Sequence, residues 1–304
     1  MAVAVRKAPA HYFPVERRPF SMRAGLLKFP TDFGNGKADR LVFQVDSDLE
    51  RALAAKRAPR PTPRYFEHVT SPVEASALDA VRAWVEARML AEVPERLHSA
   101  ASDSGATSRW DALGRTVQED LVVMHEGEGG AGKALMLHVS FPSGWYPERL
   151  PGASFLVIHE PVPTFPGPDG DPKAAAAAQS MIRSMVERGP YVRFVWTVRA
   201  DDALDHHPDE GGRQRWTATS PGYLRVERQL TWPFPDVRAS LFVIRTYVMS
   251  FASLPTPERD VLREAVVRMP PAFAAYKGIP EDAALVLGAL SRCALGPLEE
   301  RNPR

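Results

Sequence analysis

One histidine, His159, stands in a sequence setting that suits metal chemistry. It ends an apolar run that begins at Phe155, and Pro161 and Pro163 follow at once. A neutral imidazole at the mouth of an apolar pocket, on backbone stiffened by prolines, is what an axial haem ligand requires. A core histidine with a satisfied hydrogen bond fits the same stretch. The stretch alone leaves both interpretations open.

Four other histidines have to be considered as possible metal ligands. His138, in the apolar stretch Leu135–Val139, is a rival metal ligand or a residue that faces the metal. His206 and His207 stand among acidic residues, but adjacent loop residues chelate a metal poorly. We therefore expect that loop to be solvated. His125 ends a predicted strand beside glycines, and we expect it to be exposed.

Three predicted strands carry arginine where their apolar pattern predicts at least partial burial. These are Arg193 in Tyr191–Arg199, Arg228 in Tyr223–Thr231 and Arg245 in Leu241–Met249. An unpaired buried charge costs several kcal/mol, so each guanidinium needs a partner. Glu227 offers an ion pair within the sheet. The carboxylates of a cofactor, such as haem propionates, would serve equally well, and the arrangement alone does not decide between them.

Composition describes an ordinary globular protein and excludes several classes. The chain has 304 residues, 44% apolar and 25% charged, which suits one domain spanning residues 1–304. The net charge of +1 without blocks of like charge gives no sign of a nucleic-acid partner. No apolar run approaches the roughly 20 residues that span a bilayer, and no secretory leader is visible, so we expect a cytoplasmic protein without a membrane partner. The single cysteine, Cys293, excludes an internal disulfide and an iron–sulfur cluster.

Capping residues and hydrophobic periodicity predict an α+β fold, in which residues 1–40 form an irregular arm. The expected helices are Asp46–Lys56, Ser71–Val93, Asp171–Gly189, Thr256–Met269 and Glu281–Leu295. The expected strands are Gln118–His125, Lys133–Phe141, Tyr191–Arg199, Gly212–Thr217, Tyr223–Thr231 and Val237–Phe251. Short connections after Tyr191 predict an antiparallel sheet. For Pro151–His159 the residues favour strand and helix about equally.

Seven short motifs, in this order, resemble a known family. They are QEDLVVMH (118–125), FPSGW (141–145), IHEPVP (158–163), RFVW (193–196), YLRVERQL (223–230), FVIRTYV (242–248) and AYKG (275–278). Together they resemble the haem-dependent oxidative N-demethylase alpha-subunit family. The resemblance runs from about Phe20 to the last predicted helix.

The resemblance implies a fold and a haem site. The fold would be PAS-like, an antiparallel sheet with flanking helices that enclose one haem b. His159 would be the iron ligand. Residues at the cofactor would be Arg193, Trp196, Arg225, Arg228 and Arg245. Of these, Arg225, Arg228 and Arg245 would bind propionates or hydrogen-bond the ligand histidine. Glu227 and Arg228 are the residues that we assign to catalysis, Glu227 by orienting an arginine or by delivering protons.

The implied reaction is oxygen-dependent N-demethylation of a small secondary amine such as dimethylamine, which yields formaldehyde. Electrons would come from a separate flavin and iron–sulfur reductase, because this chain has neither a nucleotide-binding glycine motif nor the cysteines. A non-catalytic PAS-like module that binds haem or another small ligand for sensing is the alternative. One departure bears on the substrate: Val195 stands where the family usually has asparagine.

Overall fold

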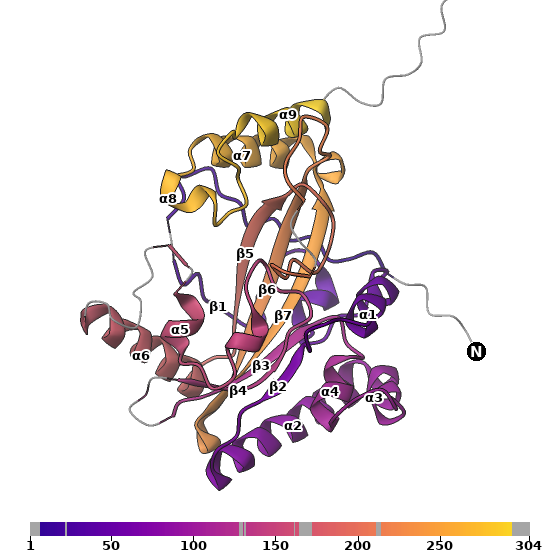
Figure 1. Ribbon diagram of the computed structural model, residues 1–304, viewed down its shortest axis with the longest axis vertical. Helices are drawn as coiled ribbons and strands as arrows, with labels where there is room; N and C mark the ends of the chain where they lie inside the picture. Colours follow the sequence, from indigo (N-terminus) through magenta and orange to yellow (C-terminus); the bar gives the residue numbers. More distant parts are fainter. Residues whose placement is uncertain are drawn as a thin grey trace, which may run out of the picture.

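The computed structural model describes residues 7–21, 23–127, 130, 132–160, 162–163, 172–210 and 214–293 (Figure 1). Within them the helices are α1 (Leu49–Arg57), α2 (Pro72–Glu92), α3 (Pro94–Ala101), α4 (Arg109–Gly114), α5 (Phe155–His159), α6 (Pro172–Glu187), α7 (Thr256–Val267), α8 (Pro271–Ala274) and α9 (Ala284–Arg292). The strands are β1 (Leu27–Lys28), β2 (Tyr65–Glu67), β3 (Asp120–His125), β4 (Lys133–His138), β5 (Tyr191–Arg199), β6 (Tyr223–Phe234) and β7 (Ala239–Ser250).

In the described residues the strands form one open antiparallel sheet, in the order β1-β5-β6-β7-β3-β4-β2. The long strands β6 and β7 pair along their whole length, from Tyr223 opposite Ser250 to Phe234 opposite Ala239. The expected mixture of helices and an antiparallel sheet is confirmed. None of the helices that the structure describes is long and apolar enough to cross a membrane.

Most expected elements are present, and their ends differ by a few residues. Ser71 caps α2 by accepting a hydrogen bond from the backbone N–H of Glu74 at 3.2 Å, and Pro72 takes the first helical position. The undecided segment before His159 is helical. Residues 214–217 are not strand, so that prediction is wrong for them. Asp171, Gly212, Arg213 and Leu295, at the ends of expected elements, lie outside the described residues.

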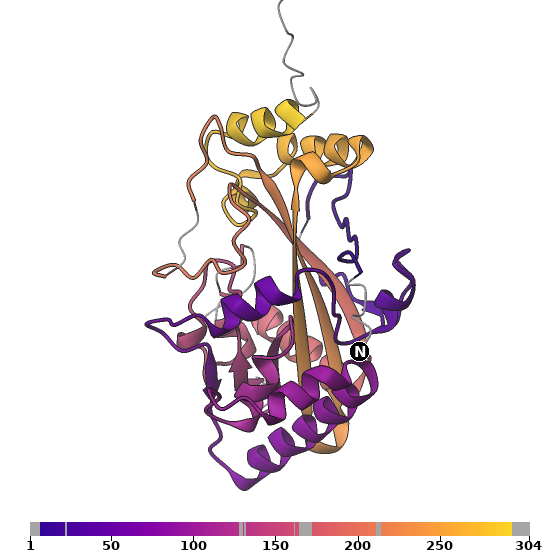
Figure 2. The same ribbon diagram turned by 90° about the vertical axis from the view of Figure 1, so that its right-hand side faces the viewer.

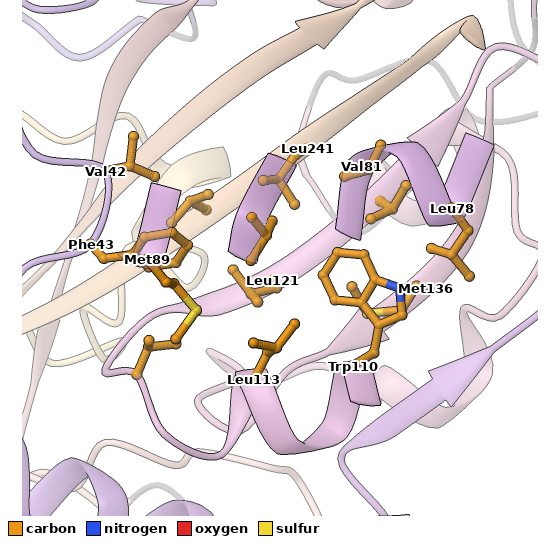
Figure 3. Close-up of a cluster of buried hydrophobic side chains, with 14 of the residues drawn as sticks. Val42, Phe43, Leu78, Val81, Met89, Trp110, Leu113, Leu121, Met136 and Leu241 are labelled. Atoms are coloured by element: carbon orange, nitrogen blue, oxygen red, sulfur yellow. The ribbon is translucent and has the colours of Figure 1, made fainter. Parts of the chain in front are cut away.

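Helices, together with the N-terminal segment that contains Tyr12 and Val15, bury most of one face of the sheet, and we call it the closed face. Helices α2, α3 and α4 pack at one end of the long strands and α7–α9 at the other (Figures 1 and 2). Figure 3 shows Met89 of α2 and Leu113 of α4 packed around Leu121 of β3. Apolar burial of this kind contributes about 25 cal/mol per Å². The closed face is therefore the main hydrophobic core.

The other face, which we call the open face, is covered only at its ends. Helices α5 and α6 pack over one end of it, and α1 with Phe141 and Leu204 packs over the other. Between these covers the central strands keep accessible surface. The partly exposed side chains there are Arg193, Val195, Glu227, Gln229 and Ile244. A sheet centre that is solvent-accessible on one face only is a natural place for a ligand.

Candidate functional site

His159 ends α5, beside the open face, and its ring is held in one orientation. Ser154 caps this short helix. The Nδ1 atom of His159 lies 2.8 Å from the carbonyl oxygen of Phe155, and the two rings are in contact at a tilt of 31°, with centroids 4.0 Å apart. Because a carbonyl oxygen only accepts hydrogen bonds, Nδ1 carries the proton and the lone pair is on Nε2. This is the tautomer that a metal-binding histidine needs.

Burial keeps the imidazole of His159 neutral. Burial and the positive charge of Arg193 together lower its pKa to about 4, against a raising effect of the Phe155 hydrogen bond. The side chain nevertheless keeps some accessible surface. We call the partly accessible centre of the open face, which contains Arg193, the hollow. The charge of Arg193 acts on His159, so the ring lies near this hollow, and it is neutral at neutral pH with its lone pair on Nε2.

Arg193 of β5 brings a positive charge to the same hollow. Burial lowers the pKa of Arg193, while Tyr276 and Glu227 act in the opposite direction. Among the residues that the structure describes, its guanidinium has no hydrogen bond and no ion pair. A cation held in this way is stabilised by an anionic ligand. The open face therefore combines a neutral imidazole with a positive charge that suits a carboxylate.

Glu227 is the acidic side chain at the centre of the open face, and neighbours fix both of its oxygens. Arg225 Nη2 lies 3.3 Å from Oε1, and Gln229 Nε2 donates to Oε2 at 2.9 Å. Arg225 is 1% exposed and also donates to the carbonyl oxygens of Phe141 and Leu204, at 2.7 and 2.8 Å. Glu227 thus forms its ion pair within the sheet with Arg225, which was not one of the three arginines for which this pair was expected. This ion pair holds a carboxylate at the edge of the hollow.

The structure does not bring Arg228 and Arg245 to the open face. Arg225 and Arg228 are three residues apart on one strand, so they point to opposite faces of the sheet. On the closed face Arg245 pairs with Asp46 at 2.7 Å, and Arg228 donates to the carbonyl oxygen of Leu41 at 2.8 Å. Arg228 and Arg245 therefore have protein groups as partners, which was the alternative to binding the carboxylates of a cofactor. The sheet separates them from His159.

Trp196 also faces away from Arg193, because the two lie on opposite faces of β5. It is 5% exposed and makes an edge-to-face contact with Phe20, with centroids 6.4 Å apart. A cavity of about 730 Å³ between residues 11–27 and the edge of β5 is lined by both Trp196 and Arg193. Arg193 therefore borders both this cavity and the open face.

Residues 276–278, which sequence reasoning did not assign to the site, extend the edge of β5. The backbone N–H of Val198 donates to the carbonyl oxygen of Lys277 at 2.8 Å. At Gly278, with φ of +78°, an added Cβ would lie 2.1 Å from the Val198 carbonyl oxygen, so glycine is required. Burial raises the pKa of Tyr276 and lowers that of Lys277 to about 7. In the sequence, the AYKG motif (275–278) was the feature that could have indicated these residues.

The remaining histidines are held by protein groups. His138 lies on the closed face, with Nε2 3.2 Å from Asp111 Oδ1. The expectations of exposure are wrong: His125 is 5% exposed, and His206 and His207 are each 1% exposed. The loop that carries His206 and His207 contacts residues 141–148: the backbone N–H of His206 donates to the carbonyl oxygen of Pro142, and His207 Nε2 lies 3.1 Å from Glu148 Oε2. In the described part of the chain, no group of three or more His, Cys, Asp or Glu side chains could hold a metal ion.

Comparison with known families identifies the chain. It matches the family described as "Haem-dependent oxidative N-demethylase, alpha subunit-like" over residues 52–287, more than three quarters of its length. The chain belongs to this family. The family's name states that its activity depends on haem and that its members resemble one subunit of a larger assembly. The resemblance read from the seven motifs is confirmed.

The residues on the open face fit the group that the family's name requires. A histidine that supplies one axial bond must be neutral, with its other nitrogen hydrogen-bonded, and His159 satisfies both conditions. The propionates of haem need a cation, and Arg193 has no acidic partner in the part of the chain that is described.

Proposed function

We propose that the chain binds haem b at the open face with His159 as the axial ligand, and oxidises an N-methyl group of a small secondary amine to release formaldehyde. One observation carries the proposal: the bond from Nδ1 of His159 to the Phe155 carbonyl, which leaves the lone pair on Nε2 of a neutral ring. Family membership supplies the haem dependence and the reaction class.

Each residue on the open face has a distinct part in this proposal. The Phe155 carbonyl increases electron donation by His159 by accepting its Nδ1 proton. Arg193 would neutralise a propionate. Val195 and Ile244 provide apolar surface for methyl groups and exclude water. Glu227, held by Arg225 and Gln229, would exchange protons with the substrate side of the hollow. When bound, haem supplies the oxygen activation and the oxidising power.

The wider proposal concerns the fold and the partners. We assign a PAS-like arrangement to residues 1–304 as one domain, with the haem at the accessible centre of the open face, beside α5. A single cysteine cannot hold an iron–sulfur cluster, so a separate flavin and iron–sulfur reductase would supply the electrons. The words "alpha subunit" in the family's description support a partner of that kind.

Formaldehyde release tests this function directly. Protein expressed with haem supply is mixed with dimethylamine, oxygen and a reduced flavin as electron donor, and formaldehyde is measured over time. Wild type and His98→Ala, which changes an exposed histidine of α3, are expected to produce formaldehyde, whereas His159→Ala is expected to produce none above background. Haem bound by wild type without any formaldehyde would favour the sensing module. Equal activity in all three proteins would contradict the role of His159.

A further inference from the structure

A buried polar cluster lies behind the pair Arg225–Glu227. His206 Nε2 lies 3.0 Å from Asp201 Oδ1, and the carboxylate of Asp201 also accepts from the backbone N–H groups of Ala203 and Gln214, at 2.9 and 3.1 Å. These hydrogen bonds and the proximity of His206 lower the pKa of Asp201 in spite of its burial. Because the carboxylate accepts, Nε2 of His206 carries the proton and the lone pair is on Nδ1.

Several buried side-chain atoms of this region have no hydrogen-bond partner among the described residues, and three of them are His206 Nδ1, Arg225 Nε and Thr197 Oγ1. Thr197 and Arg225 face each other in register on β5 and β6. Arg225 Nη1 donates to the carbonyl of Leu204, two residues before His206, and the charge of Arg225 acts on His206. The three atoms thus belong to neighbouring side chains. Leaving such atoms unpaired costs about 1–3 kcal/mol each.

The chemical characters of the three atoms are complementary to one small neutral molecule. Arg225 Nε donates, His206 Nδ1 accepts, and the Thr197 hydroxyl does either. A water molecule accepts one bond, donates another and has one left for the hydroxyl, and buried waters make about three such bonds. An anion would face the lone pair of His206, and a cation would face Arg225. Water is the ligand that satisfies all three atoms.

We propose that one buried water bridges Thr197, His206 and Arg225, and that His206 acts through it as a positioning residue for Glu227. The water site stands on the geometry of the cluster, whereas its effect on turnover rests on the proposed function. Asp201 holds His206 in place, the water connects His206 to Arg225, and Arg225 holds Oε1 of Glu227 at 3.3 Å. The loop that carries His206 thereby influences a carboxylate in the hollow without touching it.

Two substitutions of His206 separate the water contact from the contact with Asp201. His206→Gln keeps an N–H at the place of Nε2 for Asp201 but has no acceptor at the place of Nδ1. His206→Asn keeps an acceptor near the place of Nδ1 and gives up the bond to Asp201. High-resolution crystal structures of wild type and both variants should show the water in wild type and His206→Asn, and not in His206→Gln. Wild-type density with no water there, or with the three atoms bonded to protein groups, would overturn the site.

The rate of formaldehyde production tests the positioning role. His206→Gln is expected to lower kcat about tenfold with little change in KM, as expected for loss of orientation at one proton-exchanging group. His206→Asn is expected to keep most of kcat. If the two variants have equal kcat, the positioning role is wrong. If wild type itself makes no formaldehyde, the proposed function fails, and the diffraction data still decide the water site.

Discussion

Two arginines on the two faces of one sheet differ in whether the protein itself supplies a counter-ion. Arg245, on the closed face, is 2% exposed and has the carboxylate of Asp46 at 2.7 Å. Arg193, on the open face, has no such partner in the described part of the chain and lies within reach of His159 electrostatically. A buried charge with its own counter-ion is part of the framework. A charge without one points to a ligand.

The largest expected effect comes from removing the counter-ion on the closed face. Asp46→Ala leaves the buried guanidinium of Arg245 without the carboxylate with which it pairs, so the free energy of unfolding should fall by about 3–5 kcal/mol. Arg193→Met, on the open face of the ligand-free protein, should change it by less than about 1 kcal/mol, because no ion pair is broken. Urea unfolding followed by circular dichroism measures both. Similar losses in the two variants would remove the distinction between the faces.

Two valines, one on each face of the sheet, give a second test of the difference between the faces. Val226, on the closed face, is 0% exposed, whereas Val195 keeps accessible surface on the open face. Val226→Asn should lower the free energy of unfolding by about 3 kcal/mol, because an amide is buried without partners. Val195→Asn should lower it by less than about 1 kcal/mol, because its amide can be hydrated. Equal unfolding midpoints in urea would show that the open face is packed as tightly as the closed face.

The pH dependence of stability tests the cover over the open face. Burial lowers the pKa of His206 to about 4, below the value of about 6.5 in an unfolded chain. The folded state therefore prefers the neutral ring, and its stability is complete above pH 6.5 and declines as the pH falls toward 4. At pH 5 the loss from this histidine should be about 2 kcal/mol.

The control for this effect is His206→Gln, which has no titrating ring at that place. Its free energy of unfolding should fall less steeply than that of wild type between pH 7 and pH 5. Parallel curves for the two proteins would show that the ring of His206 does not stay neutral in the fold.

Local patterns predicted the five longer strands, β3 to β7, whereas the short strands β1 and β2 were missed. The role of His159 stays a prediction. The alternation of apolar residues predicts β5 with the bounds that the structure has, Tyr191–Arg199. The apolar run before two prolines singled out His159, and its position at the end of α5 follows from Ser154 as the cap. The short helices α3 and α4 were missed, although Pro94 and Ser108 stand at their starts as ordinary helix signals.

Long-range partners could not be predicted from these patterns. Arg245 and Asp46 are 199 residues apart, so nothing local shows that this arginine is already neutralised. His125 and His206 stand beside glycines or acidic residues, and only the tertiary fold buries them. The three-residue spacing of Arg225 and Arg228 did contain the information that they face opposite sides. Both arginines lie in the family motif YLRVERQL (223–230), and a match to the motif does not show that they point to opposite faces of the sheet.

A haem titration tests the central claim most directly. Haem is added to purified ligand-free wild type, His159→Gly and His98→Ala, and the Soret band is recorded. We expect saturation at one haem per chain in wild type and His98→Ala, and a weak or shifted band in His159→Gly that added imidazole restores. An unchanged Soret band in His159→Gly, or no band in wild type, would contradict the assignment of His159 as the ligand of a haem on the open face.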